Sequence, residues 1–116
     1  MKINITPHQD YQVVRIEDEL EIITDLSELK FLIDGYISVG KHKIAVAFSN
    51  TSYIYSGAIA VLMSCHNTLS EYDEGELCIV EPNKEIRWIF SKLNIDKVLN
   101  IYDSIDELPI KTSEDS

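Results

Sequence analysis

The most informative stretch of the sequence is residues 48–62, which read FSNTSYIYSGAIAVL. An apolar run, residues 43–48, leads into it, and the polar residues 49–52 end that run. A short and nearly continuous apolar run is typical of a strand that is covered on both faces. Small and apolar residues follow from Ser56 onward, which predicts a helix. The stretch therefore indicates a buried strand, a polar loop and a helix that starts near Ser56.

Further strands are predicted on both sides of this central one. Upstream, residues 13–16 form a β-branched run, and Ile3 and Ile5 indicate an edge strand before it. Downstream, residues 76–80 form another apolar run, and a last strand is expected at about residues 98–102. A short turn then leads to Pro109, which stops that element.

The first helix is predicted upstream of the central strand. Thr24 or Asp25 can cap it, and it is expected to run to about Val39. Gly40 follows, where the end of a helix often requires glycine. The apolar residues that recur at helical spacing, and would form its buried face, are Leu26, Leu29, Ile33, Tyr36 and Ile37.

Two more helices are predicted, one from Ser56 and one that begins at Pro82 and Asn83. Their expected apolar stripes are Ile59, Leu62, Met63, His66 and Leu69 in the first, and Ile86, Ile89, Phe90 and Leu93 in the second. Trp88 is out of phase with the second stripe. We therefore expect it at the edge of that helix, partly exposed.

Strands that alternate with helices imply an α/β fold with a largely parallel sheet. We expect four or five strands and about four helices. The chain has 116 residues, which suits a single domain over residues 1–110. The polar tail, residues 111–116, has nothing to bury and is expected to fray.

The charge balance narrows the classes of partner. The chain has 20 acidic and 10 basic residues, a net charge of −10, and lacks the basic stripe needed to bind nucleic acid. This acidity also disfavours an anionic membrane surface, and it either favours a protein partner with a basic face or serves solubility. The first residues lack the apolar run of a signal peptide, and no stretch approaches the roughly 20 apolar residues of a membrane span. We expect a soluble cytoplasmic protein.

Residue spacing gives no support for an enzyme, a cofactor or a metal site. The four glycines are scattered and form no phosphate-binding loop. The three histidines and two cysteines lack metal-ligand spacing, and no set of serine, histidine and carboxylate can be proposed. Cys65 and Cys78 have apolar neighbours, which predicts two buried thiols in a reducing compartment.

Ser56 is the candidate site of regulation. Backbone N–H groups are free at the start of a helix, and the helix dipole favours negative charge there. A phosphate on Ser56 would therefore be electrostatically favourable. Gly57, Ala58 and Ala60 are small and would let another protein approach the first turn closely. The alternative is that Ser56 only caps the helix.

A family resemblance rests on this same stretch. Residues 53–62, YIYSGAIAVL, are similar without a gap to the pattern YIDSSGLGVL that follows the central strand in STAS (sulfate transporter and anti-sigma factor antagonist) domains. Tyr55 replaces the aspartate of that pattern, Gly57 and Ala58 replace its second serine and its glycine, and Asp18 replaces the glycine of an earlier turn. The other landmarks that agree in order and spacing are residues 16–21, 76–83, 86–98 and 100–104, so the resemblance covers roughly residues 10–108.

The resemblance implies a STAS α/β sandwich and a bacterial partner-switching protein. In the family, the unmodified antagonist binds an anti-sigma factor that is also a serine kinase. Phosphorylation releases the antagonist, and a phosphatase resets it. The family's phosphorylated serine corresponds to Ser56, so this chain would be a kinase substrate and not an enzyme. The residues expected to touch the partner are Tyr53, Tyr55, Ser56, Gly57, Ala58 and Ala60.

Two other functions stay open. STAS-like domains also occur as non-phosphorylated binding or scaffold subunits of larger signalling or transport assemblies, and Tyr55 in place of aspartate is compatible with that role. A small enzyme or ligand-binding protein is the third class, disfavoured because no catalytic set was found. A weak homodimer is left open, whereas neither a nucleic acid nor a membrane is expected as a partner.

Overall fold

The computed structural model describes residues 2–20, 26–48 and 53–109. Its sheet has five strands in the spatial order β1-β2-β3-β4-β5. Strand β1 pairs antiparallel with β2, and the remaining neighbours pair in parallel. The strands are β1 (Ile3–His8), β2 (Tyr11–Ile16), β3 (Lys43–Ala47), β4 (Glu76–Val80) and β5 (Ile101–Tyr102). The predicted α/β fold with a mostly parallel sheet is confirmed.

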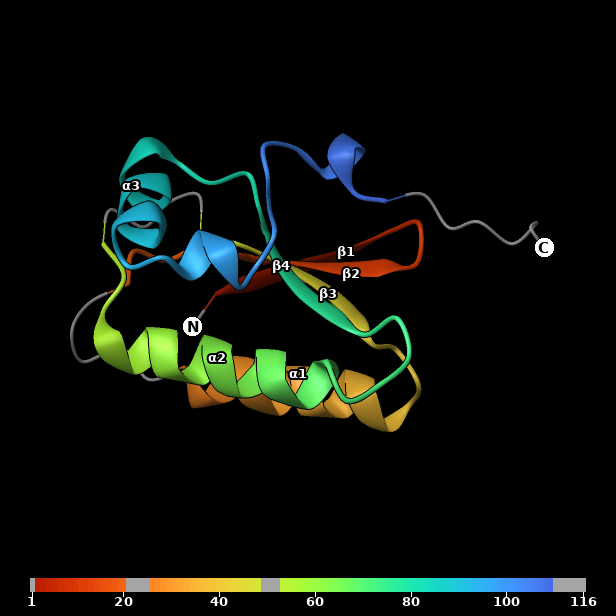
Figure 1. Ribbon diagram of the computed structural model, residues 1–116. Helices are drawn as coiled ribbons and strands as arrows, with labels where there is room; N and C mark the ends of the chain where they lie inside the picture. Colours follow the sequence, from red (N-terminus) through yellow and green to blue (C-terminus); the bar gives the residue numbers. More distant parts are fainter. Residues whose placement is uncertain (1, 21–25, 49–52, 110–116) are drawn as a thin grey trace.

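Three α-helices connect the strands in the described part of the chain. They are α1 (Ser27–Ser38), α2 (Ser56–Leu69) and α3 (Lys84–Lys92). Two short 3₁₀ helices, η1 (Ile95–Lys97) and η2 (Ile105–Glu107), flank β5. In place of the roughly four helices that we expected, the described residues thus form three α-helices and two 3₁₀ turns. Helices α1 and α2 lie side by side below the sheet in Figure 1, and α3 lies at the upper left, after β4.

The two faces of the sheet are covered differently. One face packs against all three helices and forms the larger core; its strand residues include Val14, Ile16, Ile44, Val46, Leu77 and Ile79. The opposite face carries a smaller core, which Leu108 covers, with Ile105 and Tyr102 packed at its margin. Its strand residues are Tyr11, Val13, Ala45, Ala47, Cys78 and Val80. Because β3 and β4 are buried on both faces, their sequences are nearly continuous apolar runs.

Local sequence signals account for several element ends. Asn83 caps α3, where its side-chain oxygen accepts the N–H of Ile86 at 2.8 Å. Gly40 follows α1 with φ +85, a left-handed conformation that glycine adopts without strain. Its N–H bonds the carbonyl of Ile37 at 3.0 Å, which satisfies one of the helix's last acceptors. Thr24 and Asp25, the predicted caps of α1, lie outside the described residues.

Three sequence-based placements are corrected. The buried side of α2 is Ala58, Leu62, Cys65 and Leu69, whereas Ile59, Met63 and His66 are only partly buried. Leu93 is exposed, because it follows the last turn of α3 and the chain reverses at Asn94 with φ +61. Val98 is likewise exposed beside η1, so the last strand is shorter than predicted and contains only Ile101 and Tyr102.

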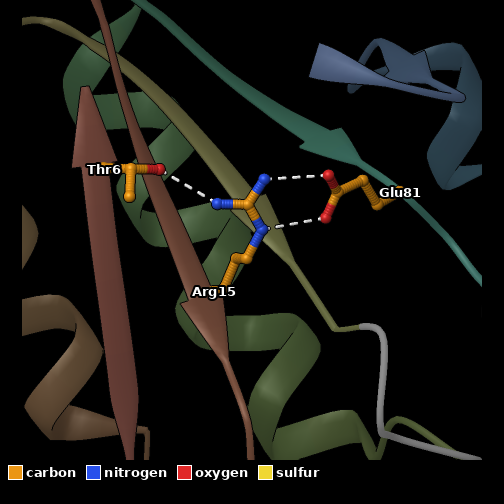
Figure 2. Close-up of polar contacts among 3 residues, drawn as sticks. All are labelled: Thr6, Arg15 and Glu81. Carbon is orange, nitrogen blue, oxygen red and sulfur yellow. Dashed lines mark hydrogen bonds and ion pairs between the residues drawn. The ribbon is translucent and has the colours of Figure 1, made fainter. Parts of the chain in front are cut away.

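A bidentate ion pair links β2 to the residue that follows β4 (Figure 2). Arg15 in β2 donates from Nε to one oxygen of Glu81 at 3.0 Å, and from Nη2 to the other at 2.8 Å. Its remaining Nη1 donates to the Thr6 hydroxyl of β1 at 2.9 Å. Arg15 lies opposite Ala47 in the register with β3, and this small side chain leaves room for the guanidinium to reach across.

Candidate functional site

Ser56 is the first residue of α2, and its side chain is exposed. Tyr55 holds the N-cap position in an extended conformation (φ −95, ψ 160), and no side-chain hydrogen bond caps the helix. The alternative that Ser56 serves as the cap is therefore wrong. The first bond within the helix runs from the N–H of Ile59 to the carbonyl of Tyr55 at 3.0 Å. Hence the N–H groups of the first three helical residues have no acceptor within the helix.

The start of α2 is electrostatically suited to an anion. Its first turn contains no acidic side chain. The helix dipole places partial positive charge on the free N–H groups at this end. Because Tyr55 stands at the N-cap, no neighbouring carboxylate in the turn would repel a phosphate on Ser56. The local field therefore favours a negative charge on this serine more than on one in the middle of a helix.

Five of the six predicted contact residues are at least partly exposed. Tyr53 is 49% exposed, so its ring is accessible to a partner. The Tyr55 ring is half-buried, with its centroid 4.7 Å from that of Tyr53. Gly57 and Ala60 are exposed, whereas Ala58 is buried in the core below α2. Ala58 is therefore removed from the contact surface, because the helix turns this residue toward the sheet.

Sequence reasoning missed a groove beside this helix start. The groove has a volume of about 310 Å³, and its walls are Tyr53, Lys84, Glu85, Trp88 and Ile89. A second hollow of about 210 Å³ continues from it past the same tyrosine and tryptophan to Lys92 and Leu93. Trp88 is 63% exposed, as its phase in the helix predicted. The sequence did not show that α3 brings Trp88 beside Tyr53, because the two residues meet only in the folded chain.

The charge around the groove opposes the charge of the whole chain. The charged side chains that line the two hollows are Lys84, Glu85 and Lys92, with a net charge of +1, although the chain carries a net charge of −10. Lys92 places its Nζ 5.8 Å from the centroid of the Trp88 ring, a cation–π contact. Arg87 is paired with Asp103. A partner at this surface would therefore meet exposed aromatic rings with a basic rim.

The described residues offer little for other chemistry. Among them no group of three or more histidine, cysteine or acidic side chains could hold a metal ion. Burial raises the pKa of both the Cys65 and the Cys78 thiol, so neither favours a nucleophilic thiolate. Within the described ranges, no helix is both long enough and apolar enough to cross a membrane.

Comparison with known proteins finds relatives of this chain. A relative from Thermotoga maritima, named "putative anti-sigma factor antagonist", is 26% identical in an alignment of 102 residues that covers 80% of this chain and 89% of the relative. The crystal structure of a Thermotoga maritima protein with the same description superposes with a TM-score of 0.79, at 25% identity over 90% of this chain and 89% of that one.

More distant structures share the fold. The anti-sigma factor antagonist SpoIIAA in its unphosphorylated form gives a TM-score of 0.69 at 16% identity, over 98% of this chain and 91% of that one. The phosphorylated form of SpoIIAA, a Bacillus cell fate determinant, gives 0.64, also at 16% identity, over 98% and 95%. The sequence pattern of the STAS domain matches residues 2–108. This chain therefore belongs to the STAS domain family.

Proposed function

We propose that this chain is an anti-sigma factor antagonist that binds an anti-sigma factor serine kinase in the cytoplasm and is released when Ser56 is phosphorylated. The single observation that carries the proposal is the position of Ser56. It is an exposed first residue of α2, three residues after Tyr53, which lines the groove together with Trp88. The relatives named as anti-sigma factor antagonists and the known phosphorylated form of SpoIIAA support the same assignment.

The binding surface combines the start of α2 with the groove. Exposed aromatic side chains are frequent anchors of protein interfaces, and Tyr53 and Trp88 are 49% and 63% exposed. Gly57 and Ala60 are small and exposed, so the partner backbone can approach the first turns of α2. Tyr55 is half-buried against the Tyr53 ring and would hold that ring in place.

Phosphorylation would act through charge at the centre of this surface. A phosphoserine adds about −1.5 to −2 charges, which the free N–H groups of α2 can stabilise in the unbound chain. In the complex the same charge must lose its water, and any carboxylate of the partner nearby would repel it. The modification therefore stabilises the free state relative to the bound state. The chain itself is the substrate in this cycle and catalyses no step, and a phosphatase would reverse the modification.

The test is a titration of Ser56 variants against the purified anti-sigma factor kinase of the same organism. We expect Ser56→Ala to bind as the unmodified chain does and Ser56→Asp to bind at least about tenfold more weakly. Ser64→Asp is the matched control, because Ser64 is also exposed on α2 but lies two turns further along. Equal affinities for Ser56→Ala and Ser56→Asp would contradict the switch.

A second measurement separates binding from regulation. Incubation of the chain with the kinase and ATP, followed by mass spectrometry, should find phosphate on Ser56. If the kinase binds but leaves Ser56 unmodified, the chain is a constitutive binding subunit, the role with which Tyr55 in place of aspartate is compatible. If Trp88→Ala leaves the affinity unchanged, the groove is not part of the interface.

A further inference from the structure

The free edge of β1 is a second surface of this molecule, distinct from the start of α2. Strand β1 has β2 on one side and stands first in the strand order, so its other side has no strand beside it in the described sheet. Residues 3–8 contain no acidic, lysine or arginine side chain, although such charges commonly protect exposed sheet edges. Only Pro7 limits what can pair there.

The hydrogen-bond pattern shows which backbone groups face outward. The N–H of Glu17 donates to the carbonyl of Lys2 at 2.9 Å. Bonded and non-bonded pairs alternate along an antiparallel ladder. In the observed register, Ile3, Ile5 and Pro7 are consequently the non-bonded positions. The N–H and C=O groups of Ile3 and Ile5 therefore point to the open edge, where Pro7 supplies only a carbonyl.

We propose that a second copy of this chain pairs with β1 along this edge and forms a twofold-symmetric dimer with one continuous sheet. An axis through Asn4 sets Ile3 of each copy opposite Ile5 of the other, and each such pair exchanges two hydrogen bonds. The same register places Lys2 opposite Thr6, so no like charges face each other along the strands. The edge is thus complementary to itself.

An apolar groove next to the strand supports the second copy as its occupant. The groove has a volume of about 290 Å³ and lies between β1 and α1; its walls are Ile3, Ile5, Glu28, Phe31 and Leu32. Phe31 is 82% exposed, the highest value among the large apolar side chains that are exposed. A twofold axis normal to the sheet keeps both α1 helices on the same face. It thereby brings the two Phe31 rings and the two grooves together at the junction.

The charge and size of the edge predict a weak dimer. A chain with a net charge of −10 repels its own copies, and this repulsion is smallest where an uncharged strand makes the contact. The contact consists of a short strand edge and two phenylalanine side chains, and we expect it to bury less than the roughly 1,200–2,000 Å² of a stable interface. Association should therefore depend on concentration and should strengthen as salt screens the repulsion.

Sedimentation velocity of the full chain between about 10 µM and 1 mM tests the proposal. We expect the mass to rise toward that of two chains, and Phe31→Ala to weaken association at least about tenfold. Ile5→Pro removes the outward N–H that β2 does not use, and Ile5→Ala removes the same side chain but keeps this N–H. Ile5→Pro should therefore associate more weakly than Ile5→Ala, while circular dichroism shows both folded.

Three outcomes overturn the proposal. One is a chain that stays monomeric up to about 1 mM at high salt. Another is association that Phe31→Ala and Ile5→Pro leave unchanged. The third is a dimer that Trp88→Ala dissociates instead, which would place the contact at the groove beside α3. The first two results leave the proposed binding of a kinase at Ser56 untouched, whereas the third would make the second copy and the kinase compete for the groove.

Discussion

Neutralising Glu81 should destabilise the fold at neutral pH and should do so less as the pH falls. Its carboxylate accepts both Nε–H and Nη2–H of Arg15, and this guanidinium lowers the pKa of Glu81 below its usual value. Glu81→Gln removes the charge and keeps the shape of the side chain. The substitution does not relieve backbone strain either, because residue 81 has φ +54 and glutamine is no better suited to that conformation than glutamate.

The expected loss of stability follows from how exposed the Arg15–Glu81 ion pair is. Exposed ion pairs contribute about 0.2–1 kcal/mol, and hydrogen bonds to charged groups contribute about 1.5–3 kcal/mol. The side chains of Arg15 and Glu81 are 26% and 31% exposed, which places this pair between the two cases. We therefore expect Glu81→Gln to lower the free energy of unfolding by about 1–2 kcal/mol at pH 7, or Tm by about 4–10 °C.

The pH dependence gives the sharper test. A glutamate with a lowered pKa in the folded chain contributes stability above its unfolded value of about 4.3, and this contribution is lost as the pH falls through the folded pKa. Urea unfolding at pH 7 and at about pH 3 should therefore show a difference between wild type and Glu81→Gln that is smaller in acid. Glu71→Gln, an exposed residue in the turn after α2, is the control and should be neutral. A Glu81→Gln difference of equal size at both pH values would refute the reasoning.

Two further predictions concern buried thiols and glycines. Cys65 and Cys78 are buried, so both should resist a thiol reagent at pH 8 in the native chain and react once urea unfolds it; rapid native labelling of either would contradict the burial. A Cβ on Gly75 would lie 2.0 Å from a backbone oxygen, whereas one on Gly35 in α1 would meet nothing within 4 Å. Thermal melts should therefore show Gly75→Ala destabilised by more than about 2 kcal/mol and Gly35→Ala stabilised by about 0.5–1 kcal/mol, and the opposite order would contradict the structure.

The sequence was most informative where the signal is local. The strand at residues 76–80 was predicted with its observed bounds, and the central strand to within one residue, because both are short apolar runs between polar turns. Asn83 and Gly40 also marked element ends correctly, since capping depends on the residue's own side chain or backbone freedom.

The remaining features depend on contacts between distant segments. The stripe of α2 was misassigned because Ile59 and Cys65 are both apolar, and only the sheet below decides which of them is buried. The sequence correctly predicted that a helix starts near Ser56. That Tyr55, not Ser56, holds the N-cap position depends on the backbone conformation of Tyr55. The groove beside Trp88 could not be predicted, because its walls come from the loop before α2 and from α3.

The two proposed surfaces should act independently, because they lie at different places on the sheet. Ser56 follows β3, the middle strand, whereas the dimer edge is β1, two strands away at the margin. Sites that share no contacts usually add their effects without coupling. We therefore expect Ser56→Asp to change the dimer dissociation constant by less than about twofold, and Phe31→Ala to leave kinase affinity unchanged to the same degree. Light scattering should accordingly find two kinases on each dimer at high concentration. If Ser56→Asp dissociates the dimer instead, the two surfaces overlap, and the partner would compete with the second copy.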